Sequence, residues 1–456
     1  MKIKVPEHVE YIVNTLIENG YEAYAVGGCV RDTILGRVPG DWDITTSAKP
    51  EEVKALFKRT IDTGIEHGTV TVMLDKIGYE VTTYRIDGEY EDNRHPKSVE
   101  FTSNLVEDLK RRDFTINAMA YNHQDGIVDE FSGLEDIQKK VIRCVGNASD
   151  RFDEDALRIM RAVRFAAQLG FTIEEQTQLA IQNKAEHLKN ISAERIRVEL
   201  VKLLISNHPE LLVSAYELGI TKVVLPEFDV MMETEQINPH HIYSVGMHTI
   251  KSIEAMKDMV KAREDITEKE YTALCLTMLL HDVGKPKMRV TDETGTDRFH
   301  GHPEESAVIA KHILRRLKFD NHTIDMVTRL VLYHDYRVEP TAVAVRRAAN
   351  KIGLEYMPYL FFVQRADVLA QNPTTQEEKL ERIRNVEILF EELLEKNQCV
   401  QLKDLSISGK DLIANGHKPG KELGFILQKL LEMVIEQPEL NEKEKLLAIS
   451  ETIRMS

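Results

Sequence analysis

The most constraining feature of this chain is the segment from residue 27 to residue 43, GGCVRDTILGRVPGDWD. It ends in two carboxylates, Asp41 and Asp43, that are separated by one residue. The residues that follow, Ile44-Thr45-Thr46, favour a strand, and side chains two residues apart on a strand lie on the same face. Two carboxylates on one face are suitable ligands for Mg²⁺, which can bind a triphosphate and lower the pKa of an attacking hydroxyl.

The start of the same segment predicts a phosphate-binding turn. Gly27 and Gly28 precede an apolar run from Val30 to Leu35, which indicates a helix. The backbone N–H groups at Gly28 can face a phosphate there, with Arg31 close by. Alternating acids are common on solvated strand faces, so the carboxylate pair alone does not identify a site.

Length and composition favour a multidomain protein without a membrane span. A chain of 456 residues is too long for one core, and we expect two to four domains. The longest nearly uninterrupted apolar run, residues 273–280, is far shorter than a membrane helix. Four scattered cysteines, Cys29, Cys144, Cys275 and Cys399, predict reduced thiols, and we therefore expect a cytoplasmic protein.

The net charge of −16 argues against indiscriminate binding to nucleic acid, because that affinity comes mainly from a positive field. Local basic surfaces remain possible, since seven arginines lie between residues 111 and 164: Arg111, Arg112, Arg143, Arg151, Arg158, Arg161 and Arg164. Any RNA contact should therefore be local and shape-selective.

Periodicity in the first third of the chain predicts an α/β unit. Apolar spacing indicates a helix over residues 6–19 that covers the sheet, and a second helix over residues 107–120. The expected strands cover residues 69–74 and 79–84, joined by a turn at residues 76–78, and residues 126–131 and 141–145. Glu80, on the second of these strands, is a candidate third carboxylate, and an exposed strand glutamate is nearly as plausible.

A helical row of charged residues follows. Asp155 and Arg158 lie three residues apart and share a helix face, which Arg161 and Arg164 continue. Such a row is usually a solvated stripe. A carboxylate and a guanidinium also complement the amino donor and ring-nitrogen acceptor that cytosine and adenine both present, whereas uracil and guanine present the reverse. This pair can thus select C and A without a template.

Taken together, the motifs resemble those of class II tRNA nucleotidyltransferases, the CCA-adding enzymes, and of bacterial poly(A) polymerases. The motifs are GG-x-VRD, the Asp41–Asp43 pair, RRDFTINA at residues 111–118 and EDALRIMRAVRF at residues 154–165. The resemblance covers roughly the first half of the chain. It implies addition of the tRNA 3′-terminal CCA from CTP and ATP, with Mg²⁺ held by Asp41 and Asp43.

The resemblance also implies roles for other residues. Arg112 would contact the nucleotide phosphates or sugar, with a structural ion pair to Asp108 or Asp113 as the alternative. Asp155 and Arg158 would recognise the base, assisted by Arg161 and Arg164. A loop at residues 88–96 distinguishes full CCA-adding enzymes from CC-adding ones, and Lys410, Lys418 and Lys421 of the tail would contact the RNA backbone.

The second half contains another set of residues that suggests chemistry. His248, His281-Asp282 and Asp367 lie on separate predicted helices, and Gly284-Lys285-Pro286 follows the His-Asp pair. This arrangement resembles the HD phosphohydrolase superfamily, in which these residues hold one divalent metal and His302 and His334 can extend the site. Imidazole and carboxylate ligands suit a transition metal that activates water against a phosphate ester. The alternative is a helical scaffold that binds RNA without turnover.

The predicted fold class is an α/β nucleotidyltransferase head, a small mixed sheet with helices, followed by an all-α neck, HD domain and tail. The predicted boundaries are 1–147 for the head, 148–237 for the neck, 238–375 for the HD domain and 376–456 for the tail. Two alternatives remain: a poly(A) polymerase or A-adding enzyme with the same head motifs, and an HD phosphohydrolase whose head only senses nucleotides.

Overall fold

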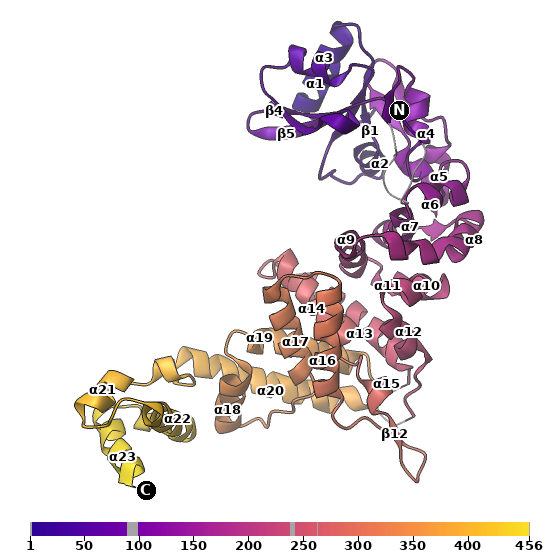
Figure 1. Cartoon of the computed structure of the whole chain (residues 1–456). Helices are drawn as coiled ribbons and strands as arrows, with labels where there is room; N and C mark the ends of the chain where they lie inside the picture. The colour runs from indigo at the N-terminus through magenta and orange to yellow at the C-terminus, as the bar shows by residue number, and fades with distance from the viewer. Residues whose placement is uncertain (1, 89–98, 238–241, 262, 456) are drawn as a thin grey trace. The chain divides into compact units, whose positions relative to one another are not determined.

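The computed structural model describes residues 2–88, 99–237, 242–261 and 263–455. The chain forms two compact units, Met1–Asp229 and Val230–Ser456, each with its own core (Figure 1). The predicted four-part division is finer than this and stays a prediction. The predicted loop at residues 88–96 falls almost entirely outside the described residues.

The first unit is built around a seven-stranded mixed sheet with the order β3-β4-β5-β2-β1-β8-β9. At its centre, β2 pairs antiparallel with β1 and parallel with β5. The strands are β1 (Ala23–Val26), β2 (Asp43–Thr46), β3 (Thr60–Gly64), β4 (Thr69–Leu74), β5 (Ile77–Thr83), β8 (Ala120–Asn122) and β9 (Gly126–Val128). This arrangement confirms the predicted mixed-sheet head.

Helix α1 (Glu7–Glu18) confirms the helix predicted over residues 6–19. Its apolar stripe, Val9, Ile12, Val13 and Leu16, is buried, and the helix packs on β1 and β2. Two short helices, α2 (Gly28–Ile34) and α3 (Pro50–Leu56), follow β1 and β2 respectively. The apolar spacing therefore identified the correct face of α1.

The predicted strand over residues 69–74 is β4, and its partner β5 begins at Ile77, two residues earlier than predicted. The turn lies at Asp75 and Lys76, whose φ angles of 47° and 68° are both positive. Two consecutive positive φ angles match the twist of a tight hairpin, so the chain reverses before Gly78 rather than at it.

The prediction that both carboxylates of the Asp41–Asp43 pair lie on a strand was wrong. Asp43 is the first residue of β2, and Asp41 lies in the connection before it. Val26 is the register partner of Asp43 and the last residue of β1. The next residue, Gly27, has a φ of 82° and turns away, so β1 offers no partner for the residues before Asp43.

The helix predicted over residues 107–120 was also wrong beyond residue 110. Helix α4 (Leu105–Lys110) ends there, a 3₁₀ turn covers Thr115–Asn117, and β8 begins at Ala120. The backbone of this segment bonds to a distant one: Thr115 N–H donates to Arg143 O at 2.9 Å, and Val145 N–H donates to Asp113 O at 3.1 Å. These tertiary bonds override the local helical pattern.

The last two predicted head strands are shorter than expected. Strand β9 ends at Val128 because the Asp129 carboxylate accepts from the N–H groups of Gly133 (2.7 Å) and Leu134 (2.9 Å), which start α5 (Gly133–Lys139). Strand β10 (Val141–Ile142) pairs in parallel with β11 (Thr172–Ile173) and does not join the seven-stranded sheet.

The rest of the first unit is mainly helical, as predicted, although the short strand β11 interrupts the predicted all-α neck. Helix α7 buries ten of its thirteen residues, and Gly170 ends it with a φ of 69°. The helices are α6 (Ala148–Glu154), α7 (Leu157–Leu169), α8 (Glu175–Lys184), α9 (Ala193–Leu204), α10 (Leu212–Glu217), α11 (Thr221–Val224) and α12 (Pro226–Glu233), which spans the boundary of the units.

In its described residues the second unit is helical apart from one small hairpin, β12 (Val290–Thr291) with β13 (Asp297–Arg298), which the all-α prediction did not include. Its main helices are α13 (Val245–Val260), α14 (Glu268–Leu280), α15 (Lys285–Met288), α16 (His302–Arg316), α17 (Asn321–Tyr333), α18 (Ala342–Ile352), α19 (Met357–Leu369) and α20 (Gln376–Glu395). Among the described residues, no helix combines the length and apolarity needed to cross a bilayer.

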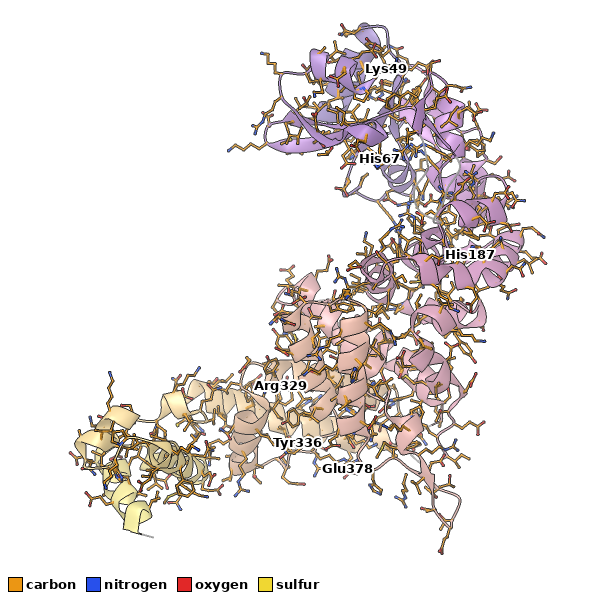
Figure 2. All side chains as sticks on the ribbon, in the orientation of Figure 1. Lys49, His67, His187, Arg329, Tyr336 and Glu378 are labelled. Carbon is orange, nitrogen blue, oxygen red and sulfur yellow. The ribbon has the colours of Figure 1, made fainter. Side chains whose placement is uncertain are left out.

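The end of the second unit has a small core of its own. Helices α21 (Gly409–Ala414), α22 (Lys421–Glu436) and α23 (Lys443–Met455) surround an apolar cluster that includes Leu412, Leu430 and Leu446. Positive φ angles of 88° at Gly416 and 144° at Gly420 allow the chain to turn before α22. Side chains cover both units (Figure 2).

Candidate nucleotide and metal sites

The first candidate site lies where β1 ends and β2 begins. A Cβ atom at Gly27 would meet Arg112 Nη1 at 3.1 Å, so the guanidinium packs against this turn. Although Asp43 is exposed, the surrounding protein partly desolvates its carboxyl group and raises its pKa, the Arg112 charge lowers that pKa, and the Asp41 charge raises it. The structure therefore brings Asp41, Asp43 and Arg112 within electrostatic reach of one another.

This site fits a hard divalent cation. Asp41 and Asp43 are both exposed, and the charge of Asp41 opposes ionisation of Asp43, which a bound cation would relieve. Ile44 is the register partner of Val81, so Glu80 stands beside Asp43 on the neighbouring strand, and it is exposed as well. Its role as a third ligand stays a prediction.

Arg112 has the structural ion pair that the sequence offered as an alternative. Its Nη2 lies 3.4 Å from Asp108 Oδ2, and Arg111 Nη2 lies 2.6 Å from the other oxygen of that carboxylate. Asp108 is fully buried, which alone would raise its pKa, but the charges of Arg112 and Arg111 lower it. One side of the Arg112 guanidinium is therefore anchored while another faces the Gly27 turn.

Arg31 lies close to the glycine turn with its donors engaged inside the protein. It forms a bidentate contact with Asp32 at 2.9 Å for each bond, and its Nη1 donates to Asn117 Oδ1 at 2.6 Å. Gly28 is the first residue of α2, directly after the Gly27 turn. Arg31 thus fixes α2 to the 3₁₀ turn, and its contact with phosphate stays a prediction.

The prediction that Asp155 and Arg158 share a helix face was wrong, because Asp155 lies between α6 and α7 with an extended backbone (φ −139°, ψ 101°). The two side chains also face different partners. Asp155 Oδ2 lies 2.7 Å from Arg195 Nη2, whereas Arg158 Nη1 lies 2.6 Å from Glu154 Oε2 and its Nη2 donates to Arg111 O at 2.8 Å. Arg158 is only 9% exposed, so the predicted row of charged side chains is not an ordinary solvent-exposed stripe. The sequence analysis missed Arg195, which belongs to no motif and lies 40 residues away.

Arg161 and Arg164 bind carboxylates from other segments. Arg161 makes two bonds to Asp113 Oδ2, of 2.8 and 2.6 Å, and Arg164 Nε lies 2.8 Å from Glu199 Oε2. Burial alone would raise the pKa of Asp113, but the Arg161 guanidinium holds it well below its usual range. Arg164 also stacks on the Phe165 ring at 3.5 Å. These contacts join α7 to α9 and to the segment after α4 that contains Asp113.

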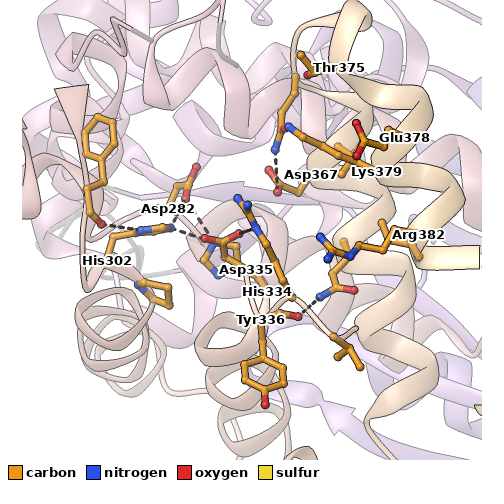
Figure 3. Close-up of a pocket in the computed structure, with 18 of the residues that line it drawn as sticks. Asp282, His302, His334, Asp335, Tyr336, Asp367, Thr375, Glu378, Lys379 and Arg382 are labelled. Carbon is orange, nitrogen blue, oxygen red and sulfur yellow. Dashed lines mark hydrogen bonds and ion pairs between the residues drawn. The ribbon is translucent and has the colours of Figure 1, made fainter. Parts of the chain in front are cut away.

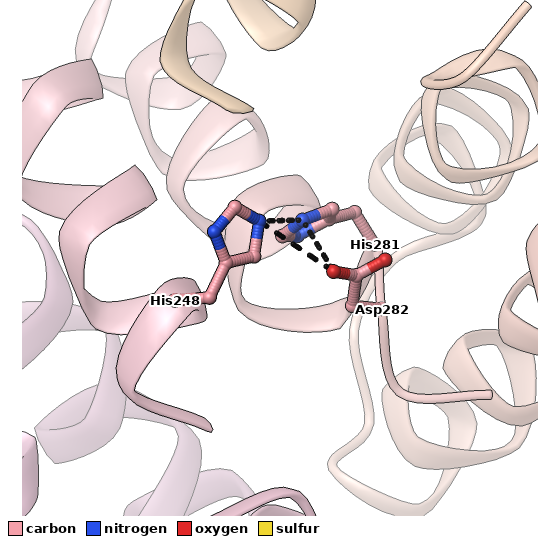
Figure 4. Close-up of side chains that lie close together, drawn as sticks. All are labelled: His248, His281 and Asp282. Atoms are coloured by element: carbon pink, nitrogen blue, oxygen red, sulfur yellow. Dashed lines mark hydrogen bonds and ion pairs between the residues drawn. The ribbon is translucent and has the colours of Figure 1, made fainter. Parts of the chain in front are cut away.

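The second candidate site is a buried cluster in the second unit, here called the histidine cluster: His248, His281, Asp282, His302, His334 and Asp367. The structure brings the four predicted ligands together from α13, the end of α14 and α19, and adds the two histidines that could extend the site (Figure 4 shows His248, His281 and Asp282). His248 and His281 are 0% exposed and Asp282 is 1% exposed.

Backbone contacts fix the orientation of every imidazole in the histidine cluster. The Nδ1 atoms of His281, His302 and His334 lie 2.7, 2.9 and 2.7 Å from the carbonyls of Met278, Phe299 and Val331, and His248 Nδ1 lies 3.4 Å from Ala370 O. A carbonyl can only accept, so each Nδ1 carries the proton and each Nε2 of the neutral ring offers a lone pair.

The Nε2 atoms form two close pairs. His248 and His281 have their Nε2 atoms 3.3 Å apart, and His302 and His334 have theirs 3.2 Å apart. Two lone pairs that face each other repel unless a positive charge lies between them. Two nitrogens that each lie about 2.1 Å from one metal, at an angle of about 90–109°, are about 3.0–3.4 Å apart, which matches both pairs.

Asp282 connects the two pairs. Its Oδ2 lies 3.2 Å from His281 Nε2, and its Oδ1 lies 3.4 Å from His302 Nε2. Neither oxygen accepts a well-directed hydrogen bond among the described residues, although Lys285 Nζ stands 2.7 Å from Oδ2. Asp367 Oδ1, at 2.9 Å from His248 Nε2, completes the first group. The residues therefore fit two divalent cations: His248, His281 and Asp282 would hold one, and Asp282, His302 and His334 would hold the other.

The electrostatics of the histidine cluster favour positive charge at its centre. Burial lowers the pKa of His281, but the carboxylates of Asp282 and Asp367 outweigh it and raise the value to about 10. Either protons or divalent cations can supply that charge.

A cavity of about 1350 Å³ opens onto the histidine cluster. Asp282, His302 and His334 stand on one side, and Lys379 and Arg382 of α20 stand on the other (Figure 3). Tyr336 also lines it, and Figure 2 shows its place in the second unit. The cavity is larger than a typical site for a small molecule and gives the cluster a route to a bulky ligand.

A mixed sheet with a carboxylate pair at the start of a central strand, followed by helices, defines a nucleotidyltransferase. Three family models match the chain: the poly(A) polymerase head domain over residues 23–143, the RNA- and SrmB-binding site of polymerase A over residues 170–232, and tRNA nucleotidyltransferase domain 2 over residues 304–449.

Individual relatives are more specific. A CCA-adding enzyme of Lactobacillus helveticus is 37% identical over 430 residues, 93% of this chain and 91% of the relative. That of Lactiplantibacillus plantarum is 58% identical over 198 residues, 43% of this chain and 49% of the relative, so this match spans about half of that protein. The crystal structure of the Bacillus stearothermophilus CCA-adding enzyme in complex with CTP has a TM-score of 0.72, 31% identity and coverage of 99% of this chain and 98% of that one. The chain belongs to the family of CCA-adding enzymes.

Proposed function

We propose that this chain adds and repairs the 3′-terminal CCA of tRNA, using CTP and ATP and releasing pyrophosphate. One observation carries this proposal: the carboxylate pair, Arg112 and the Asp155–Arg158 segment occur within an end-to-end match to CCA-adding enzymes, one of which was solved with CTP. The head motifs alone are shared with poly(A) polymerases, so the head does not decide between the two activities.

In the proposed reaction the 3′-hydroxyl of the RNA attacks the α-phosphate of the nucleotide, the new O–P bond forms, and the bond to the β-phosphate breaks. Asp41 and Asp43 would hold the divalent cation, for which we propose Mg²⁺, and that ion supplies charge neutralisation and a more acidic hydroxyl. Arg112, anchored by Asp108, presents its free side to the phosphates at the Gly27 turn.

For base selection, Asp155 accepts from the exocyclic amino group and Arg158 donates to the ring nitrogen. Arg195 holds Asp155, and Glu154 holds Arg158, so both groups are oriented by a neighbour that the base must displace or share. Arg161 and Arg164 hold α7, the helix that carries Arg158, against Asp113 and Glu199.

The test uses tRNA transcripts that end before the first C, before the second C or before the terminal A, incubated with CTP, ATP or both. With CTP and ATP together we expect three, two and one added nucleotides respectively, followed by a stop. Continued addition of A residues would identify a poly(A) polymerase, and addition of A alone would identify an A-adding enzyme.

For the histidine cluster we propose a second activity, metal-dependent hydrolysis of phosphate esters such as nucleoside 2′,3′-cyclic phosphates. The clustering of imidazole nitrogens and carboxylate oxygens into two groups of potential ligands that share Asp282 favours this proposal over a passive scaffold. A divalent transition metal held there would activate water for attack on phosphorus. Release of product from such esters by metal-loaded protein tests the proposal.

Partners and location follow from the proposed activity. Lys410, Lys418 and Lys421 are exposed around the turn before α22 and are proposed to contact the tRNA backbone. All four cysteines are free and buried, which supports a reducing compartment, and we propose the cytoplasm.

A further inference from the structure

The cavity beside the histidine cluster contains one lysine to which the proposed phosphohydrolase activity assigns no role. Lys379 of α20 lines this cavity together with Asp282 and His302 (Figure 3). Its Nζ donates to Gln371 Oε1 at 2.5 Å, and Gln371 Nε2 donates to Asp367 Oδ2 at 3.0 Å. Two hydrogen bonds and one amide group thus separate the ammonium from Asp367, a path of about 8 Å at most.

The other cations of the cavity each have a carboxylate beside them. Lys285 stands 2.7 Å from Asp282, Arg382 stands 2.7 Å from Glu339, Arg298 stands 3.1 Å from Asp292, and Arg337 stands 3.6 Å from Asp335. Within the described parts of the chain, Lys379 has no carboxylate within 4.0 Å, and its nearest recorded partner is the neutral amide of Gln371. It is the cavity cation whose charge the protein leaves uncompensated at close range.

An ammonium group without a nearby counter-charge is stabilised when an anion binds beside it. Burial lowers the pKa of the Lys379 ammonium, and the charge of Asp367 opposes that effect. A partly desolvated ammonium held in place by one hydrogen bond still has two N–H donors available. An anionic ligand in the cavity would provide both a counter-charge and acceptors at little cost in side-chain entropy, because Gln371 already fixes the position of Nζ.

We propose that Lys379 is a phosphate-binding residue, which donates to a non-bridging oxygen of the phosphoryl group that the histidine cluster receives. This inference rests on the proposed phosphohydrolase site and names the residue that selects its ligand by charge. Gln371 is a positioning residue, because its amide joins Lys379 to Asp367 and so fixes the ammonium relative to the cluster. The chemical class of ligand is a phosphate ester or free phosphate, held between the cluster on one wall and α20 on the other.

A purely structural role predicts a different outcome. If Lys379 served only to hold Gln371, and through it Asp367, then its loss would loosen the cluster and lower metal content. The phosphate affinity of the protein that still carries metal would then be unchanged. Measuring metal content and phosphate affinity on the same samples separates the two roles.

The experiment uses the full chain carrying Asp41→Ala and Asp43→Ala, so that the head does not bind cation and phosphate. The protein is loaded with Mn²⁺, its metal content is measured, and inorganic phosphate and adenosine 3′-phosphate are titrated by calorimetry. We expect Lys379→Met to weaken both ligands by about tenfold to a hundredfold, as for loss of one bond between charged partners. Lys379→Arg should stay within about threefold, and Gln371→Met should be intermediate.

The matched control is Arg382→Gln, which removes a cation from the same helix and cavity but one that Glu339 already compensates. We expect it to change phosphate affinity less than twofold. The proposal is overturned if Lys379→Met leaves phosphate affinity unchanged at normal metal content, if it lowers only metal content, or if the metal-loaded parent binds no phosphate. Phosphate binding through Lys379 without hydrolysis of any ester would instead refute the phosphohydrolase proposal and leave this one standing.

Discussion

The two candidate sites of this chain differ in how much of the site exists before a ligand arrives. Asp41 and Asp43 are exposed, and only Asp43 belongs to a strand. In the histidine cluster, His248 and His281 are fully buried, and a backbone carbonyl fixes each imidazole. The head thus offers an incomplete set of ligands, whereas the second unit offers a complete one.

This difference indicates when each cation binds. Two exposed carboxylates bind a hard cation weakly until the triphosphate contributes its own oxygens. Buried imidazoles with fixed tautomers lose little entropy on binding, and metal binding relieves the repulsion between their lone pairs. We therefore expect a transient cation in the head and resident cations in the histidine cluster.

The largest expected effect separates the two sites by activity. Asp41→Ala combined with Asp43→Ala should reduce CCA addition by roughly a thousandfold or more, because several kcal/mol of charge stabilisation are lost. Hydrolysis of phosphate esters should remain at the wild-type rate. Rates are measured by single-nucleotide extension of a tRNA transcript that ends before the first C.

Circular dichroism of this double variant controls for folding, since both side chains are exposed and their loss should not unfold the sheet. Extension at a rate near that of the wild type would place the nucleotidyl-transfer site elsewhere in the chain.

The reciprocal double variant, His281→Ala with Asp282→Ala, removes the bridging carboxylate and one imidazole of the histidine cluster. We expect ester hydrolysis to fall by about a hundredfold or more while CCA addition stays within about threefold. The control is His322→Ala, an exposed histidine on α17. Loss of CCA addition in a folded variant would show that the two activities are not separable.

A smaller effect concerns base selection within the head site. Asp155→Ala should weaken CTP and ATP together by about tenfold to a hundredfold and relax rejection of UTP and GTP, since a bond to a charged partner is lost. Arg112→Ala should slow all four nucleotides alike, because a phosphate contact carries no base information. The measurement compares how efficiently the wild type and each variant incorporate each of the four triphosphates.

Arg195→Ala extends this comparison, because it removes the partner of Asp155 and leaves the carboxylate itself. If Asp155→Ala left the four relative efficiencies unchanged, or altered only one of CTP and ATP, selection through a shared base edge would be wrong.

The smallest expected effect is on stability. A chelator should lower the melting temperature of the second unit by about 6–16 °C, because bound ligand at a hundred to a thousand times its Kd stabilises the folded state by about 3–4 kcal/mol. The head transition should not move. Differential scanning calorimetry follows both, and the His281→Ala, Asp282→Ala variant, which lacks the ligands, should show no shift with chelator.

Sequence reasoning succeeded where local patterns carry the information. The stripe of Val9, Ile12, Val13 and Leu16 identified α1 and its buried face, and the apolar run before His281 identified α14. Sequence reasoning failed where contacts with distant segments determine the secondary structure. The hydrogen bonds of Thr115 to Arg143 and of Val145 to Asp113 ended a predicted helix that the local spacing supports.

Contacts between distant segments also limit what the sequence predicts about the two sites. Asp282, His248 and Asp367 could be named because they fit a known spacing of residue types, but the pairing of their atoms could not. Arg195, Gln371 and Lys379 belong to no motif. The fold brings Arg195 to Asp155 and Lys379 to Gln371, which itself lies only four residues from Asp367. Charged residues on a helix such as α20 look alike in sequence until their neighbours are known.

Counting bound metal tests the central contrast most directly. Wild type, the Asp41→Ala, Asp43→Ala variant and the His281→Ala, Asp282→Ala variant are loaded with Mn²⁺, passed through a metal-free gel-filtration column and analysed by mass spectrometry. The fit of two cations to the histidine cluster predicts about two per chain in the first two proteins and close to none in the third. A wild-type chain that retains no metal, or metal that disappears with Asp41 and Asp43, would contradict the account.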